Sequence, residues 1–115
     1  MNKQTRLQVF NKYYGKCAYC GETLEYNEMQ VDHIRSQFHK GSDELDNLNP
    51  SCRQCNFYKG TDSIEQFRER LTTIIERIKK PFIVRLAIKY GIVSFKQFNG
   101  KFYYENTKSI SRPPE

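Results

Sequence analysis

The sequence predicts a small α+β domain that is braced by a structural metal. Two Cys-x-x-Cys pairs, Cys17 with Cys20 and Cys52 with Cys55, frame a segment in which apolar and polar residues alternate. After the second pair, apolar residues recur with helical spacing. A chain of 115 residues fits one domain with a modest core. Domains of this size gain from a bound metal.

The four cysteines favour zinc over disulfides. Both pairs have the same two-residue spacing, and the polar start of the chain does not resemble a secretory signal. Four thiolates close a tetrahedral shell around Zn²⁺ and leave no open position, which is typical of a structural site. Redox-active pairs and four unrelated buried cysteines are the alternatives. Duplicate spacing in so short a chain argues against both.

The charge balance suits an anionic partner. Lys and Arg number 19 against 13 acidic residues, a formal net charge of +6, and four cysteinates with one Zn²⁺ still leave a positive surplus. Taken alone, this surplus is weak evidence for nucleic acid, because many basic proteins bind nothing anionic. No apolar run approaches the ~20 residues that cross a bilayer. We therefore expect a cytoplasmic protein with no membrane partner.

The first half of the chain is predicted to begin with a helix and a cysteine turn. Residues 5–14 place Leu7, Phe10 and Tyr14 on one apolar face, and Gly15 suits the position after a helix. We expect this face to pack against the metal core.

A strand, a loop, a second strand and a short helix are predicted to follow. Residues 28–34 alternate and indicate a strand, and residues 35–46 are polar and indicate a loop. Pro50 favours an extended conformation at Asn49, near a second strand. Residues 56–60 predict a short helix that stops at its glycine.

The second half is predicted to start with two helices. Residues 62–79 carry a stripe of apolar side chains, and Asp62 with Glu65 resembles a capping box. The stripe predicts core packing, with a dimer interface as the minor alternative; it comprises Ile64, Phe67, Leu71, Ile74, Ile75 and Ile78. A further helix over residues 82–90 is expected to bury Phe82, Ile83, Leu86, Ala87 and Tyr90.

A β-hairpin is predicted near the C-terminus. Asn99-Gly100 separates residues 92–98 from residues 101–105, and this dipeptide between alternating segments is a strong hairpin signal. Residues 108–115 are expected to form a flexible tail.

Two adjacent residues, Asp32 and His33, supply groups that phosphodiester hydrolysis needs. Imidazole titrates near neutrality, so His33 suits a general base. The carboxylate of Asp32 and the amide oxygen of Asn56 are hard ligands of the kind that Mg²⁺ prefers. Neighbouring side chains on a strand point to opposite faces, so both residues serve one centre only if the strand ends or turns after His33.

From about Tyr13 to Gly60 the chain resembles the HNH endonucleases of the zinc-knuckle type, which have a ββα-metal fold. The resemblance rests on these segments: Gly15-Lys16-Cys17-Ala18-Tyr19-Cys20-Gly21, Val31-Asp32-His33-Ile34, Lys40-Gly41-Ser42, Asp46-Asn47-Leu48 and Cys52-Arg53-Gln54-Cys55-Asn56-Phe57-Tyr58-Lys59-Gly60. It covers less than half of the chain.

The resemblance implies roles for four residues. His33 would be the general base, Asp32 and Asn56 the ligands of the catalytic ion, and Asn47 the residue that fixes the loop beside the base. Asn56 stands where many members have histidine. An all-oxygen protein shell favours Mg²⁺ or Mn²⁺ over ions that prefer imidazole.

Three further basic residues are expected to contact DNA. Arg35, Arg53 and Lys59 lie close in sequence to the catalytic or zinc positions. Ordinary surface charge is the alternative interpretation. Arg53 has the stronger claim, because it lies in the knuckle turn.

The whole prediction is an α+β chain with a ββα-metal (HNH) core, a four-cysteine zinc knuckle, flanking helices and a C-terminal β-hairpin. Residues 1–60 form the nuclease core, residues 61–107 an extension packed on the same domain, and residues 108–115 the tail. The expected function is metal-dependent cleavage of duplex or structured DNA, in a bacterial cell or phage-infected host. The alternative is a catalytically inactive, zinc-stabilised nucleic-acid-binding module. The sequence does not decide whether the protein is a monomer or a homodimer. It also leaves open whether a protein partner supplies specificity.

Overall fold

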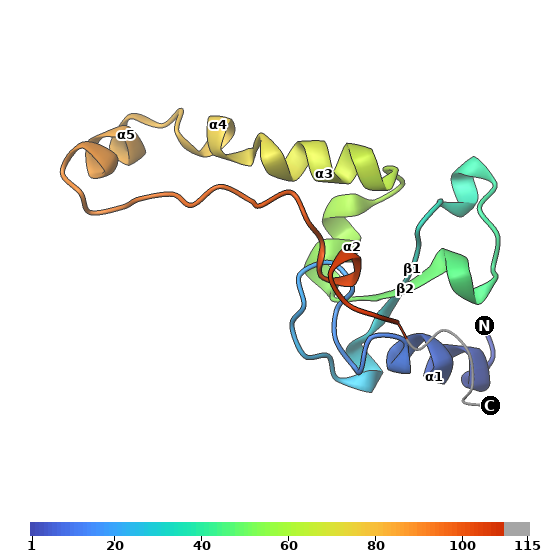
Figure 1. The fold of residues 1–115 in the computed structure, drawn as a ribbon. Coiled ribbons are helices and arrows are strands. Elements are labelled where there is room, and N and C mark those ends of the chain that lie inside the picture. The colour runs from blue at the N-terminus through green and yellow to red at the C-terminus, as the bar shows by residue number, and fades with distance from the viewer. Residues whose placement is uncertain (110–115) are drawn as a thin grey trace.

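The computed structural model describes residues 1–109, so residues 110–115 of the predicted tail lie outside the described part. Figure 1 shows a core built mainly from the first 62 residues and an arm, residues 64–100, that leaves the core and returns to it. The molecule is elongated, with principal extents of 56 × 27 × 24 Å. Within residues 1–109, no helix combines the length and the apolar character needed to span a bilayer.

The regular elements follow in chain order. The core holds α1 (Lys3–Asn11), β1 (Gln30–His33), β2 (Leu48–Ser51), α2 (Arg53–Lys59) and short 3-10 helices at Tyr26–Glu28, Gln37–His39, Leu45–Asn47 and Tyr103–Glu105. The arm holds α3 (Ile64–Thr72), α4 (Ile74–Ile78) and α5 (Phe82–Lys89).

The sheet consists of β1 and β2, paired antiparallel with Asp32 opposite Asn49 and Val31 opposite Pro50. Pro50 has no N–H to donate, and its carbonyl accepts a hydrogen bond from the Ala18 amide at 2.8 Å. This bond attaches the first cysteine turn to the sheet. Because α2 follows β2 directly, the predicted small α+β domain with a ββα core is confirmed.

The first helix buries a face that only partly matches the predicted one. Val9 is fully buried and Tyr13 nearly so, whereas Leu7 is 49% exposed and Tyr14 is 61% exposed. The helix ends earlier than predicted, and Tyr14 takes a left-handed φ of 60° before Gly15. The chain therefore turns before Tyr14 can extend the helical stripe, and the prediction was wrong for Leu7 and Tyr14, while Phe10 is partly buried against the core.

An aromatic cluster joins the core to the base of the arm. Phe67 of α3 stacks on Phe102 with ring centroids 4.8 Å apart, and Tyr19 of the cysteine turn meets both rings edge-on at 5.4 and 5.3 Å. All three residues are at most 4% exposed. Burial of large aromatic rings contributes strongly to stability, so this cluster anchors the arm to the core.

The arm begins with a broken helix. The hydroxyls of Thr72 and Thr73 donate to the carbonyls of Arg68 and Glu69 at 2.8 and 3.0 Å. Such back-bonding by threonine competes with the helical ladder, and α3 ends there, so the predicted single helix over residues 62–79 was wrong. The capping box lies one residue later than predicted, at Ser63 and Gln66.

The far end of the arm exposes the side chains that were predicted to be buried in α5. Phe82, Ile83 and Tyr90 are 68%, 69% and 71% exposed. The arm consists of one row of helices and one returning segment (Figure 1), so it has no further layer to cover them. The prediction of their burial was wrong. The stripe of α3 and α4 is covered at Phe67 and only partly buried or exposed beyond it.

The predicted C-terminal β-hairpin is also wrong. No strand forms after α5 in the described residues. The amides of Tyr103 and Tyr104 donate instead to the carbonyls of Tyr19 and Ala18, at 3.1 and 2.8 Å. The second half of the expected hairpin is therefore bonded to the cysteine turn and is not available to the first half.

Candidate active site

Four cysteine sulfurs form a metal-sized cluster beside the sheet. The sulfur atoms of Cys17, Cys20, Cys52 and Cys55 all lie within 4.8 Å of one another, and those of Cys20 and Cys52 are 3.9 Å apart. A tetrahedral zinc ion places its sulfur ligands roughly 3.8 Å apart. The amides of Cys52 and Cys55 donate to sulfur at 3.3 and 3.4 Å. The donor set and its spacing thus fit a bound zinc ion.

Without a cation, the four thiols differ in how readily they lose a proton. A hydrogen bond with Cys55 lowers the pKa of Cys17 to about 4. Burial raises the pKa of Cys20 to about 12, and the hydrogen bond to Cys17 raises the pKa of Cys55. Adjacent thiolates repel one another, so only a cation among them lets all four lose their protons.

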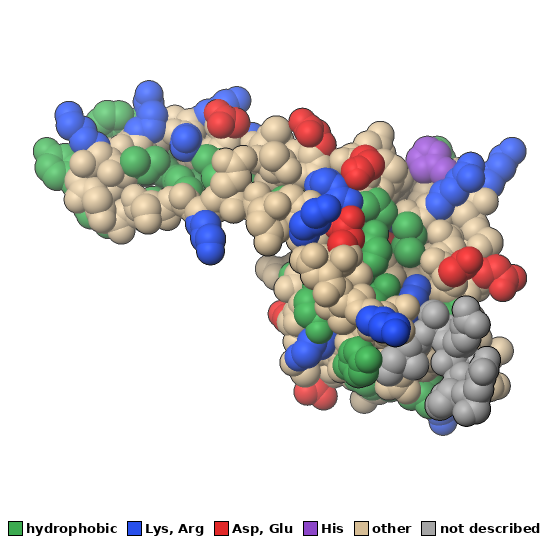
Figure 2. All heavy atoms as spheres, in the orientation of Figure 1, with side chains coloured by type: hydrophobic (Ala, Val, Ile, Leu, Met, Phe, Trp, Pro, Cys, Tyr) green, Lys and Arg blue, Asp and Glu red, His purple; other side chains and the backbone are tan. Residues whose placement is uncertain are grey.

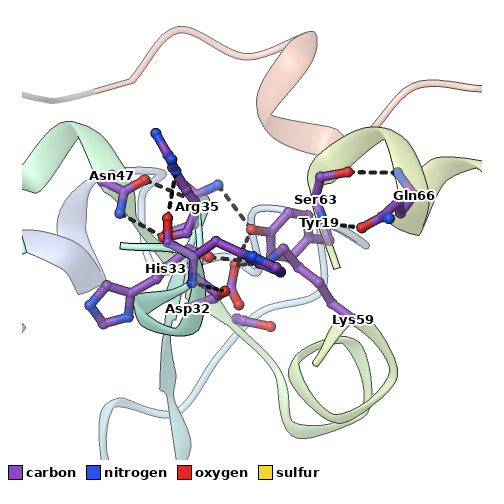
Figure 3. A network of polar contacts seen from close by, with 12 residues as sticks. Tyr19, Asp32, His33, Arg35, Asn47, Lys59, Ser63 and Gln66 are labelled. Carbon is purple, nitrogen blue, oxygen red and sulfur yellow. Dashed lines mark hydrogen bonds and ion pairs between the residues drawn. The ribbon is translucent and has the colours of Figure 1, made fainter. Parts of the chain in front are cut away.

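The two residues at the end of β1 face in different directions. Asp32 points into the core and is 4% exposed, and its Oδ2 accepts a hydrogen bond from the Tyr19 hydroxyl and lies 3.3 Å from Lys59 Nζ. His33 points away from this buried group (Figure 3). Lys59 Nζ also donates to the His33 carbonyl at 3.0 Å. This lysine therefore fixes α2 against the end of β1.

Burial dominates the electrostatics at Asp32. It raises the pKa of the Asp32 carboxyl, and the hydrogen bond from Tyr19 and the charge of Lys59 oppose that rise. Burial and the nearby carboxylate raise the pKa of Tyr19 well above its usual value. Both contacts are made to Oδ2, which leaves Oδ1 without a hydrogen bond from the described residues.

His33 is held from the loop side by an acidic residue. Its Nε2 lies 2.8 Å from Asp43 Oδ1, and Gln37 Nε2 donates to the same oxygen at 3.2 Å. The hydrogen bond with His33 is the main reason why the pKa of Asp43 is lowered. With the proton of a neutral ring on Nε2, Nδ1 carries the free lone pair.

Asn47 ties together the loop that follows His33. Its Oδ1 accepts from the Arg35 amide at 2.9 Å, and its Nδ2 donates to the carbonyls of Arg35 and Ser42 at 3.0 and 2.7 Å. Its own carbonyl accepts from the Ile34 amide at 2.8 Å. β1 ends at His33 and the chain bends at once, and the side chains of Asp32 and His33 still face in different directions (Figure 3).

Asn56 lies on α2 one turn before Lys59, and residues three apart share a helix face. Since Lys59 contacts Asp32 and the carbonyl of His33, this face of α2 is turned toward the end of β1. Asn56 is partly exposed. Asp32 and Asn56 thus lie on neighbouring elements, and their joint binding of an ion stays a prediction.

The three basic residues that were expected to contact DNA differ in exposure. Arg35 and Arg53 are exposed. Lys59 is 1% exposed and its ammonium group is directed at Asp32, so its expected contact with DNA is ruled out by burial. Its position three residues after Asn56 on a helix was the signal that placed it on the inner face.

Several residues of the site had no signal in the sequence. Asp43 belongs to an irregular loop, where spacing predicts no contacts, and Gly41 of the same loop was named only as part of the resemblance. A Cβ on Gly41 would lie 1.6 Å from the Arg35 carbonyl oxygen. Lys12 is 3% exposed, and its Nζ donates to the Leu48 carbonyl at 2.7 Å. Burial lowers the pKa of Lys12.

Comparisons with known proteins agree with this geometry. Residues 17–62 match the family model for HNH endonucleases. A crystal structure of the Type II-C Cas9 enzyme from Actinomyces naeslundii is similar, with a TM-score of 0.53 and 28% identity. The similarity covers 57% of this chain and 8% of the Cas9 chain, so the chain spans a small part of that enzyme's length. No curated protein matches. The match to HNH endonucleases thus spans residues 17–62, which hold the knuckle, both strands and α2.

Proposed function

We propose that this chain is a metal-dependent DNA endonuclease, with His33 as general base and a divalent ion held by Asp32 and Asn56. The main support is the asymmetry at Asp32. Tyr19 and Lys59 both contact Oδ2, and Oδ1 receives no hydrogen bond from the described residues. The carboxylate is therefore held in place through Oδ2, while Oδ1 is available to bind a hard cation.

The proposed reaction is the attack of water on the phosphorus of a phosphodiester. Nδ1 of His33 takes a proton from the water as its oxygen bonds to phosphorus, and the bond to the 3′ oxygen breaks. Asp43 keeps the other ring nitrogen protonated through the 2.8 Å contact. An ion held by Asp32 and Asn56 would supply Lewis-acid stabilisation of the negative charge on the phosphate and the leaving oxygen, which takes a proton from solvent. Mg²⁺ and Mn²⁺ suit this all-oxygen protein shell.

The four cysteines are proposed to hold one structural Zn²⁺. The ion would join the turn at Cys17 to the start of α2 at Cys52, and so would keep Asn56 opposite β1. Elemental analysis should find one zinc per chain, and a chelator strong enough to remove it should lower the melting temperature. A metal-free protein with the same melting temperature would contradict a structural role.

DNA is the proposed partner, with Arg35 and Arg53 as exposed candidates for phosphate contacts. We expect low sequence specificity from this chain alone. A cleavage map with one dominant site on a long duplex would refute that expectation. The competing function is an inactive zinc-stabilised nucleic-acid-binding module, which would bind DNA without any need for His33.

The experiment is cleavage of supercoiled plasmid in Mg²⁺, Mn²⁺ or EDTA. Wild-type protein should give nicked or linear product only with the divalent ion. Asn56→Ala should need a higher Mg²⁺ concentration, because one proposed ligand of the ion is removed at a partly exposed position. Binding without cleavage under every metal condition would favour the inactive module.

A further inference from the structure

A large recess lies on the other side of α2 from Asp32. It has a volume of about 890 Å³ and is enclosed by α2, the base of the arm and the segment that returns from the arm. Phe67 and Phe102 line its buried part, at 1% exposure each. Phe57 lies at its rim and is 89% exposed, which is the highest exposure among the large hydrophobic side chains in the described residues.

The lining suits a flat, neutral ring. Aromatic side chains are the largest group in the lining, and amides such as those of Gln54 and Asn99 supply polar contacts. Recesses that are mostly apolar with a few polar groups are typical of binding sites for small rings. Cys20 and Cys55 form part of the wall. Four cysteinates around Zn²⁺ carry net negative charge, so this wall disfavours a phosphate group and tolerates an uncharged base.

The charged side chains that line the recess are basic, which suits a ring that is attached to an anionic backbone. Lys96 and Lys101 line the recess, and no described Asp or Glu does. Residues 77–104 contain no acidic residue and seven basic ones, Arg77, Lys79, Lys80, Arg85, Lys89, Lys96 and Lys101. Figure 2 shows basic side chains gathered along the far end of the arm. A ligand that combines an uncharged aromatic ring with an anionic backbone is a nucleic acid strand.

We propose that this recess binds an unpaired nucleobase of the DNA substrate, with Phe57 as its stacking platform. This inference rests on the proposed nuclease function only in taking the bound nucleic acid to be DNA. Phe57 follows Asn56 on α2 but faces the recess, so a base stacked there lies one helix diameter, roughly 10–12 Å, from the proposed ion. A paired base cannot enter the recess, because its edge and both faces are occupied in the duplex. The substrate class is therefore DNA with an unpaired segment near the cleaved bond.

The test measures binding by the full chain with His33→Ala, so that no DNA is cut. The probe is 2-aminopurine placed in a single-stranded gap, and the comparison is the same base in a complete duplex. Binding to the gapped DNA should quench the 2-aminopurine fluorescence. Adding Phe57→Ala should weaken binding to gapped DNA about tenfold, as expected for loss of one base stack, and should abolish the quenching.

The matched control is Phe82→Ala, which removes another exposed phenyl ring at the far end of the arm. This substitution should leave the affinity for gapped DNA and the quenching of 2-aminopurine fluorescence unchanged. Zinc content and melting temperature should be the same for all variants, since Phe57 and Phe82 are both exposed. Equal affinity and equal quenching with and without the Phe57 ring would overturn the proposal. A recess made for an apolar peptide of a partner protein would give that result.

Failure of this inference is distinguishable from failure of the nuclease assignment. Quenching that depends on Phe57, in a protein whose wild-type form cuts no DNA, would support the recess and reject the nuclease. Cleavage of gapped DNA that Phe57→Ala leaves unchanged would support the nuclease and reject the recess.

Discussion

At the scale of single residues, neighbouring side chains hold Asp32 and His33 in position. Tyr19 and Lys59 occupy one oxygen of Asp32, and Asp43 occupies one nitrogen of His33. In the proposed mechanism the opposite atom of each side chain does the chemistry. The cysteines and the Asp-His pair were predictable because motif spacing reports on them. Asp43 was not, because its loop has no periodicity.

Lys59→Met should destabilise the protein strongly. Removing one partner of a buried ion pair leaves an uncompensated charge, at a cost of about 3–5 kcal/mol. Urea unfolding at neutral pH should show this loss, and Arg53→Met, which changes an exposed residue, should show little. Burial raises the pKa of Asp32, so acidification should shrink the difference as the carboxyl becomes neutral. Equal effects of the two substitutions would contradict the buried pair.

Gly41→Ala should impair catalysis by moving the loop beside His33. The new methyl group would lie 1.6 Å from the Arg35 carbonyl oxygen and 2.9 Å from Asn47 Nδ2. The hydrogen bonds that Asn47 makes must then break or shift. We expect a loss of at least about tenfold in the cleavage rate, the order that positioning effects reach, with zinc content unchanged. Wild-type cleavage by this variant would show that the loop is not positioned by Asn47.

At the scale of elements, the ββα unit was predictable and the C-terminal segment was not. Alternation, Pro50 and the glycine after α2 define the unit locally. Asn99-Gly100 is an equally local signal, but long-range contacts override it. The backbone of residues 103 and 104 bonds to the cysteine turn, and Phe102 is buried between Tyr19 and Phe67. Burial of an aromatic ring outweighs the preference of a two-residue turn.

Arg68 of α3 fixes this C-terminal segment, and pH should reveal its contribution. Its Nη1 and Nη2 donate to the two oxygens of Glu105 at 2.6 and 2.8 Å, and Nη1 also donates to the Gly100 carbonyl at 2.6 Å. The hydrogen bonds from Arg68 lower the pKa of Glu105 below its ordinary value of 4.5. A lowered pKa means that the pair stabilises the fold above pH 4.5 and ceases to do so as Glu105 is protonated at lower pH.

Glu105→Gln should therefore lower stability at neutral pH by about 1 kcal/mol, the upper range for a partly exposed pair. That corresponds to roughly 4 °C in melting temperature for a chain of this size. Thermal unfolding across pH should show wild type and variant converging well below pH 4.5. A difference that stays constant through this range would contradict the ion pair.

At the scale of the whole molecule, the arm was the feature that the sequence did not predict. Helical periodicity identified an apolar face on each helix, but periodicity does not reveal what covers that face. The arm is thin, so the apolar residues of α5 remain exposed. Residues 64–100 hold eight basic and three acidic residues, so the arm carries a net +5 of the chain's net charge of +6.

We expect this charge to contribute to DNA binding. Replacing Lys79, Lys80, Arg85 and Lys89 together by Gln should reduce the slope of log affinity against log salt by about 0.9 for each phosphate group that is no longer neutralised. Lys3→Gln, which neutralises an exposed lysine on α1, should leave the slope unchanged. An unchanged slope for the arm variant would place the DNA elsewhere.

The most direct test of the catalytic proposal compares the two histidines of the chain. Cleavage of supercoiled plasmid in Mg²⁺ would be measured for His33→Ala and for the matched control His39→Ala, each with its zinc content verified. His39 is exposed, and its backbone makes hydrogen bonds within the loop. We predict that His33→Ala loses cleavage while still binding DNA, and that His39→Ala cleaves like wild type. Cleavage by His33→Ala at the wild-type rate would contradict the assignment of His33 as general base.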